Sequence, residues 1–213
     1  NPCTGVKRLR VPKTVVDPFN LDEVQSIIKH VRPDFRNYYI TRFFTGMRTA
    51  EIHGLKWQFV DFERREILIR ETVVLGNTEY TKNDGSQREI KMSQPVYDAL
   101  LEQHKATSEL SEYVFCTRNG SFLSNNNVTK RVWQPLLRYL GLKHRRAYQT
   151  RHTAATLWLA SGESPEWIAR QMGHTSTEML FRVYSRYVPN LTRNDGSAME
   201  RLLSQHIHTS DHD

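Results

Sequence analysis

The sequence has few cysteines, no long apolar run and no leader-like start. Its two cysteines in 213 residues, Cys3 and Cys116, are too few for a disulfide framework and too far apart for a zinc ribbon. No apolar run approaches the roughly 20 residues that a membrane-spanning helix needs, and no charged-then-apolar leader points to secretion. We therefore expect a protein of the reducing cytoplasm that has no contact with a membrane.

Acidic side chains are also scarce relative to basic ones. The chain has 30 Lys and Arg against 23 Asp and Glu, which gives a formal net charge of +7. Such an excess favours a polyanionic partner, most often nucleic acid, although a solvated basic surface has the same composition. Hydrophobic residues make up 38% of the chain and charged residues 25%, which is typical of a globular protein rather than a disordered one.

The apolar periodicity changes from helical to alternating and back along the chain. Asn20 is a candidate helix cap, and apolar residues follow it at helical spacing. Ile67 and Ile69 alternate as in a strand, and Asn83-Asp84-Gly85 is a turn signal that predicts a hairpin between two short strands within 77–92. Later helices are predicted over 95–105, 126–140, 151–161, 165–172, 176–188 and 197–206. The predicted fold is mainly α with a small three-stranded antiparallel β-sheet, an α+β architecture.

Two arginines stand at helix starts, where the positive end of the helix dipole disfavours a base. Arg48 lies just inside a helix opened by Thr45 and Gly46, and Arg151 lies in the first turn of a later helix. Glu51 is close enough in sequence to pair with Arg48. Each arginine needs an anion, which is either a carboxylate elsewhere in the fold or an external phosphate bound by the guanidinium and free N–H groups together.

A lysine and a histidine lie in predicted turns. Lys82 ends the strand before the hairpin turn, where a lysine is usually a solubilising edge residue. His174 follows Gly173, the glycine expected to end the helix over 165–172, and is therefore held in a tight joint before the helix over 176–188. A polar residue in such a joint can be purely structural.

Two tyrosines, Tyr184 and Tyr187, fall on the apolar face of the predicted helix over 176–188. Aromatic residues on an apolar stripe are usually part of the core. The alternative is that the stripe borders a cleft in which one of the two tyrosines reacts. The helix pattern by itself leaves both readings open.

Five segments, taken in order, resemble the catalytic-domain motifs of the tyrosine recombinase (phage integrase) family. They are TGMRTAEIHGLKW, the hairpin TKNDGSQREI, RHTAAT, MGHTSTEM and a tyrosine ten residues after the histidine of the fourth segment. The resemblance spans roughly residues 15–188. It implies cleavage and rejoining of double-stranded DNA at specific recombination sites through a 3′-phosphotyrosine, without a metal, ATP or another cofactor.

The resemblance also implies roles for particular residues. Arg48 and Arg151 match the family's two phosphate-clamping arginines, and Glu51 matches the acid that holds the first of them. Lys82 matches the hairpin lysine that protonates the leaving oxygen. His174 matches the histidine that hydrogen-bonds the phosphate.

Three tyrosines lie in or near these motifs. Tyr184 matches the nucleophile, and Tyr187 is the reserve candidate. Tyr148 stands where the family usually has a histidine, three residues before the second arginine, and a phenol there can donate a hydrogen bond but cannot carry positive charge. Either that role is dispensable in this chain or His152 or another group covers it, so Tyr148 is a catalytic candidate and His152 a supporting one.

The resemblance further implies a domain layout and an assembly. Because the chain starts without methionine, we expect residues 1–15 to be the end of a linker from a missing N-terminal DNA-binding domain. Residues 16–190 are expected to form the catalytic domain, and 191–213 a tail whose helix docks on a neighbouring protomer. The resemblance also implies that the protein self-associates on DNA, as a tetramer whose protomers exchange that segment. It further implies a bacterial or phage origin and association with the nucleoid.

Three other functions remain open at this point. The helices over 165–172 and 176–188 imitate a helix-turn-helix, which would suit a non-catalytic DNA-binding protein. Asp84, Glu89 and Lys91 faintly resemble the acid–acid–lysine core of a metal-dependent nuclease. A tyrosine-type topoisomerase would use nearly the same site residues as a recombinase.

Overall fold

The computed structural model describes residues 15–74, 77–80 and 87–184 of the chain. The α-helices there are α1 Leu21–His30, α2 Pro33–Thr45, α3 Thr49–His53, α4 Gln94–Thr107, α5 Asn125–Val128, α6 Gln134–Tyr139, α7 Gln149–Ala160, α8 Pro165–Met172 and α9 Glu178–Tyr184. The strands are β1 Val60–Asp61, β2 Glu66–Ile69, β3 Glu71–Val74, β4 Asn77–Tyr80 and β5 Arg88–Lys91. A 3₁₀ turn covers Trp57–Phe59 and a π-helical segment covers Thr129–Trp133.

Helix ends follow the predictions most closely where local capping residues fix them. Helix α8 has the predicted limits, because the Ser164 side chain accepts a hydrogen bond from the Trp167 N–H and Gly173 ends the helix with a φ of 64°. The predicted helix over 126–140 is divided into α5, the π-helical segment and α6. Within the predicted helix over 176–188 the structure has α9 from Glu178 to Tyr184. Residues 185–188 and the predicted helix over 197–206 lie outside the described residues.

The three-stranded sheet has the strand order β1-β2-β5 and is antiparallel. Its register pairs Ile67 with Ile90, and both side chains are buried. Strands β3 and β4 form a separate antiparallel pair. The predicted hairpin is therefore wrong in its pairing, because its strands β4 and β5 pair with β3 and β2. Burial of isoleucines from β2 and β5 on one face outweighs nearness to the turn at 83–85, which lies outside the described residues.

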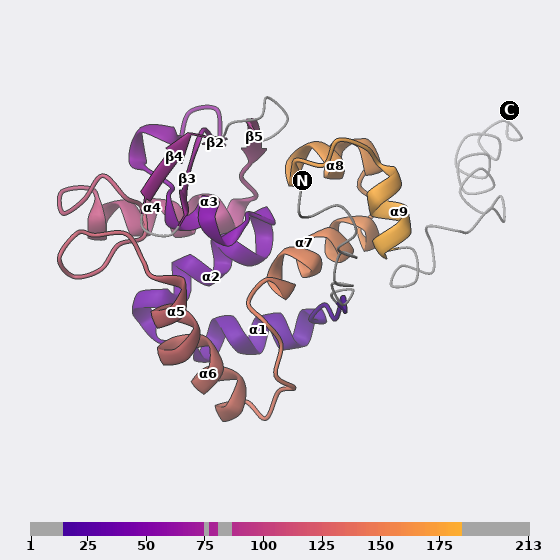
Figure 1. The fold of residues 1–213 in the computed structure, drawn as a ribbon, viewed down its shortest axis with the longest axis horizontal. Helices are drawn as coiled ribbons and strands as arrows, with labels where there is room; N and C mark the ends of the chain where they lie inside the picture. The colour runs from indigo at the N-terminus through magenta and orange to yellow at the C-terminus, as the bar shows by residue number, and fades with distance from the viewer. Residues whose placement is uncertain (1–14, 75–76, 81–86, 185–213) are drawn as a thin grey trace, which may run out of the picture.

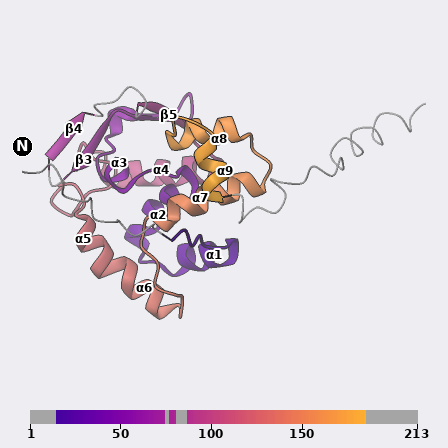
Figure 2. The ribbon, with the colours of Figure 1, turned by 45° about the vertical axis from the view of Figure 1, so that its right-hand side comes forward.

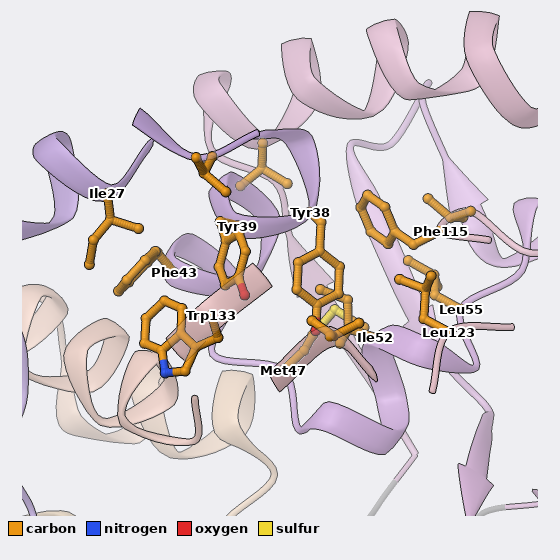
Figure 3. Packing of buried hydrophobic residues seen from close by; sticks show 14 of the residues in the cluster. Ile27, Tyr38, Tyr39, Phe43, Met47, Ile52, Leu55, Phe115, Leu123 and Trp133 are labelled. Carbon is orange, nitrogen blue, oxygen red and sulfur yellow. The ribbon is translucent and has the colours of Figure 1, made fainter. Parts of the chain in front are cut away.

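Aromatic side chains of α2 fill the centre of the larger core (Figure 3). Tyr38, Tyr39 and Phe43 are at most 1% exposed, and Tyr39 stacks on Trp133 with ring centroids 5.2 Å apart. Helix α2 packs against α1, α4 and α7. Figures 1 and 2 both show it in the middle of the molecule, with α4 on one side and α1 on the other. The mainly helical fold with a small antiparallel sheet is confirmed.

A second, smaller core joins α7, α8 and α9, which lie together on one side of the molecule (Figures 1 and 2). Its buried members are Val16, Ala155, Leu159, Ile168, Ala169, Met172, Leu180 and Tyr184. Helix α7 also packs against α2, and α8 packs against β5, so this unit is held to the larger core at two places. No helix within residues 15–74, 77–80 and 87–184 has the length and apolarity to cross a bilayer.

Candidate active site

The starts of α3 and α7 and the turn between α8 and α9 meet in one place. They carry Arg48, Arg151 and His174 respectively. Gly46 permits the close approach, because it ends α2 with a φ of 61° and an added Cβ would lie 3.3 Å from the Trp158 ring of α7. The predicted position of Arg48 inside a helix is wrong: α2 ends just before Gly46, and Arg48 is the N-cap of α3.

The Arg48 guanidinium is partly open to solvent, with 37% of its side chain exposed. Its Nη1 donates to Glu51 Oε1 at 2.8 Å, and its Nη2 donates to the Gly173 carbonyl at 3.3 Å. Its backbone N–H donates to Glu51 Oε2 at 2.7 Å. The pair expected from the i, i+3 spacing is therefore present, and it still leaves part of the guanidinium free to meet an external anion.

Glu51 has a second arginine partner that the motif comparison did not single out. Arg88 donates from Nη1 and Nη2 to the two carboxylate oxygens at 2.9 and 2.8 Å, and from Nε to the Gln171 carbonyl at 2.7 Å. Burial alone would raise the pKa of Glu51, but the hydrogen bonds and positive charges of Arg88 and Arg48 outweigh it and lower that pKa to about 2. Alternation was the available signal, because Arg88 shares the buried face of β5 with Ile90.

Glu51→Gln is expected to destabilise the fold by about 3–5 kcal/mol, because it leaves the buried Arg88 charge without its carboxylate. Urea unfolding at pH 7 measures this loss. The matched control is Glu89→Gln, whose exposed pair with Arg70 contributes about 0–1 kcal/mol. A carboxyl group whose pKa is lowered by folding stabilises the fold at every pH above its ordinary pKa. The wild-type protein should therefore lose the stability contributed by Glu51 as the pH falls from about 4.5 through about 2. Equal stabilities of the two variants would contradict this account.

Arg151 is almost fully enclosed, at 2% exposure. Its Nη1 donates to the Gly46 carbonyl and its Nη2 to the Met172 carbonyl, each at 2.5 Å, and Nη2 lies 3.3 Å from His174 Nε2. Burial first, and then the charge of Arg48, lowers the pKa of Arg151 to about 10, so it stays charged at neutral pH. These hydrogen-bond partners are neutral, so they orient the guanidinium without cancelling its charge.

His174 presents a buried nitrogen that no group in the described part of the chain satisfies. Burial, followed by the charges of Arg151, Arg48 and Arg88, lowers the pKa of His174 to about 4, so the ring is neutral at pH 7. Arg151 can only donate, which makes Nε2 the acceptor and leaves the proton on Nδ1. That Nδ1 is the buried atom without a hydrogen-bond partner. A phosphate oxygen is an acceptor of the kind that such a donor needs.

A groove borders this histidine. It has a volume of about 450 Å³ and lies between β5 and α8, and its lining carries the cationic Lys91 and Arg170 together with the carboxylates of Glu66 and Glu89. Lys91 pairs with Glu66 in the same wall, so the groove has mixed charge and does not by itself select an anion.

The Tyr184 ring belongs to the smaller core, and its hydroxyl faces a polar partner. The residue is 2% exposed, and its hydroxyl lies 2.8 Å from Nδ1 of His152, the residue after Arg151. Burial raises the pKa of Tyr184, against the opposing charge of Arg151. Burial and then Arg151 lower the pKa of His152 to about 4. A protonated phenol and a neutral imidazole therefore face each other at neutral pH.

Tyr148 lies on the solvent side of this pair. It is the N-cap residue of α7 and is 41% exposed. Its ring meets the His152 ring edge-on, with centroids 5.2 Å apart. Two other candidates, Lys82 and Tyr187, lie outside the described residues.

Two of the three residues that faintly resemble a nuclease core have other partners. Glu89 pairs with Arg70 at 2.6 Å, and Lys91 pairs with Glu66 at 2.6 Å. Asp84 lies outside the described residues. Within the described ranges, no three His, Cys, Asp or Glu side chains gather as metal ligands would.

Residues 19–190 match the model of the phage integrase family. Prophage integrase IntR of Escherichia coli K12 is 27% identical over 95% of this chain and 55% of its own length. A XerC-like tyrosine recombinase of Caldanaerobacter subterraneus is 25% identical over 95% of this chain and 60% of its own. This chain thus spans little more than half of these curated relatives.

A solved structure extends the comparison to the fold. The Tn1549 transposon integrase, determined in complex with a circular intermediate DNA, superposes with a TM-score of 0.75. The match covers 91% of this chain and 68% of the other at 19% identity, so it speaks for the fold alone. Since the family model covers most of the sequence, the resemblance inferred from the five motifs is confirmed, and the chain belongs to the phage integrase family.

Proposed function

We propose that this chain is the catalytic domain of a site-specific DNA recombinase of a phage or another mobile element. It cleaves and rejoins DNA strands through a 3′-phosphotyrosine formed by Tyr184. The observation that carries the proposal is the arrangement around Arg151. Its guanidinium is hydrogen-bonded to the α2–α3 joint and to the last residue of α8, and it lies beside His174. The next residue, His152, holds the Tyr184 hydroxyl.

The cationic groups bind the scissile phosphate and stabilise its transition state. Negative charge grows on the non-bridging oxygens when phosphorus becomes five-coordinate, and fixed donors lower the energy of that state most. Arg48 supplies a partly exposed charged donor. Arg151 and the Nδ1–H of His174 are enclosed in the free protein, so they donate to the phosphate only after DNA binding has opened the site. Glu51 holds Arg48 in place and keeps its own negative charge tied to Arg88. Removing one such donor typically costs on the order of 10²–10³ in rate.

Tyr184 is the nucleophile and His152 accepts its proton. The phenol oxygen bonds to phosphorus while the bond from phosphorus to the 5′ oxygen breaks. The phenol proton passes to His152 Nδ1, and the 5′ oxygen takes a proton from Lys82, which the family resemblance assigns as the general acid. Because the hydroxyl is enclosed in the free protein, DNA binding must shift α9 enough to bring it to the phosphate.

Tyr148 takes the place of the family's usual histidine as a neutral donor. Its exposed position beside His152 supports a hydrogen bond from its hydroxyl to the phosphate backbone. Positive charge at position 148 is then not required, because His152 rather than Tyr148 accepts the phenol proton of Tyr184. Tyr187 remains the reserve nucleophile, three residues further along the sequence.

The proposed reaction implies a larger assembly. Residues 16–190 act as the catalytic domain, 1–15 as the end of a linker from an N-terminal DNA-binding domain, and 191–213 as a tail that docks on a neighbouring protomer. Strand exchange between two duplexes then takes four protomers on DNA. One relative is a prophage integrase, and a structural neighbour is a transposon integrase in complex with DNA. Both support DNA as the partner and a mobile element of bacteria as the origin, with the bacterial cytoplasm as the place of action.

The test is covalent trapping on nicked duplexes that cover the junctions between the mobile element and its host DNA. A nick beside the cleaved bond lets the short product diffuse away, so the protein stays attached. We expect a denaturant-resistant protein–DNA adduct that forms in EDTA and without ATP, with peptide mapping locating the linkage at Tyr184. Binding without an adduct would favour a non-catalytic DNA-binding protein, and abolition by EDTA a nuclease. Adducts and relaxation on any plasmid, without junction preference, would favour a topoisomerase.

A further inference from the structure

Arg42 is a fully buried arginine outside the family motifs. It lies on α2 and is 1% exposed. Its guanidinium makes five hydrogen bonds. Nη1 donates to the Tyr38 hydroxyl at 2.7 Å, and Nη2 donates to the Thr49 hydroxyl at 2.6 Å and the Ala147 carbonyl at 3.1 Å. Nε donates to the Thr150 hydroxyl at 3.0 Å and to the Ala147 carbonyl at 3.3 Å. All three of its nitrogen atoms are therefore engaged.

The acceptors of Arg42 adjoin the two proposed clamp arginines. Thr49 directly follows Arg48, and Thr150 directly precedes Arg151. Thr150 also donates its hydroxyl proton to the Ala147 carbonyl. The Nε side of the guanidinium is therefore hydrogen-bonded to the turn at the start of α7. One rigid, planar group on α2 thus joins the start of α3 to the start of α7.

These acceptors are neutral, and each of the three nitrogen atoms of Arg42 has at least one. Tyr38 accepts from Arg42 and therefore directs its own proton to His53 Nε2, 2.9 Å away. Burial, followed by the charge of Arg42, lowers the pKa of His53 to about 3, which keeps that ring a neutral acceptor. Burying a charge among neutral groups is costly, and an apolar side chain of similar volume would often stabilise the fold equally well. What an apolar side chain lacks is the set of directed bonds to both helix starts.

We propose that Arg42 is a positioning residue that sets the spacing between Arg48 and Arg151. The proposal rests on the proposed function, because it assumes that these two arginines hold one phosphate. Arg42 itself does not reach the DNA, since it is enclosed in the core. Its contribution to the rate comes through the placement of the other two arginines, and misplacement of reacting groups by about 1 Å can cost on the order of 10²-fold.

The experiment is a double-mutant cycle on single-turnover cleavage of the nicked duplex by the full chain. Arg42→Met is expected to slow cleavage by about 100-fold, with DNA affinity changed by only a few-fold. In an Arg48→Ala background the same change should cost only about 10-fold, because one of the two arginines that it positions is already absent. Arg42→Lys should recover part of the rate, because an ammonium reaches some of the same acceptors. Arg36→Met, an exposed charge on the same helix, is the matched control and should behave as wild type.

Several outcomes would overturn the inference. Equal fold-losses in both backgrounds would show that Arg42 acts on stability or elsewhere, and an unchanged rate would show that it has no role in cleavage. If Arg42→Met does not fold, Thr49→Val removes one acceptor beside Arg48, and its smaller loss should vanish in the Arg48→Ala background. Absence of any adduct with wild type would instead refute the proposed function, which separates the two failures.

Discussion

Tyr184→Phe is expected to bind its DNA site normally and to form no covalent adduct. The substitution removes one hydroxyl and keeps the ring that packs in the smaller core. Within the described part of the chain that hydroxyl hydrogen-bonds to His152 alone, so the cost in stability should be about 0.5–1.5 kcal/mol, too little to unfold a typical domain. Without the oxygen there is no nucleophile and no phosphotyrosine. A denaturing gel with labelled nicked DNA reads out the adduct, and a native gel reads out binding.

Two further tyrosine variants complete this test. Tyr148→Phe keeps the ring beside His152 and should retain adduct formation at a reduced rate, because only a neutral donor is lost. Tyr187→Phe should react as wild type. If Tyr187→Phe lost the adduct and Tyr184→Phe kept it, Tyr187 would be the nucleophile, and the contact between Tyr184 and His152 would be structural.

Local signals in the sequence predicted the elements better than their pairing. Helix α8 has the predicted limits because Ser164 and Gly173 act on the backbone next to them. The hairpin prediction relied on an equally local turn signal and gave the wrong partners. Strand pairing there depends on where Ile67 and Ile90 are buried, which is decided by the packing of distant segments rather than by the turn.

The same difference between local and distant signals applies to the candidate site. Residues of the motifs could be named from the sequence, including Arg151 and Tyr184. The partners that hold them could not, because their contacts span long stretches of chain, as in the separation of 37 positions between Glu51 and Arg88. Alternation along β5 was a signal for a buried Arg88. Arg42 gave no comparable signal, since a lone arginine in an aromatic helix is usually expected to point to solvent.

His152→Phe is expected to slow cleavage by about 10²–10⁴-fold, the usual contribution of a positioned proton acceptor. It should also change the pH dependence. The pKa of His152 is lowered to about 4, so its acceptor nitrogen is free throughout pH 6–8 and wild-type cleavage should be flat there, falling as the pH approaches 4. In the variant the phenol must lose its proton to water, and because burial raises the pKa of Tyr184 the rate should climb about tenfold per pH unit across that range.

Single-turnover rates on the nicked duplex between pH 5 and 9 measure both effects. His144→Phe, which alters an exposed histidine on the loop before α7, is the control and should keep the wild-type rate and profile. A slow His152→Phe enzyme with a flat profile would mean that His152 orients the phenol without taking its proton. The slope is therefore the decisive quantity, because loss of orientation lowers the rate equally at every pH, whereas loss of an acceptor makes the rate follow the supply of hydroxide.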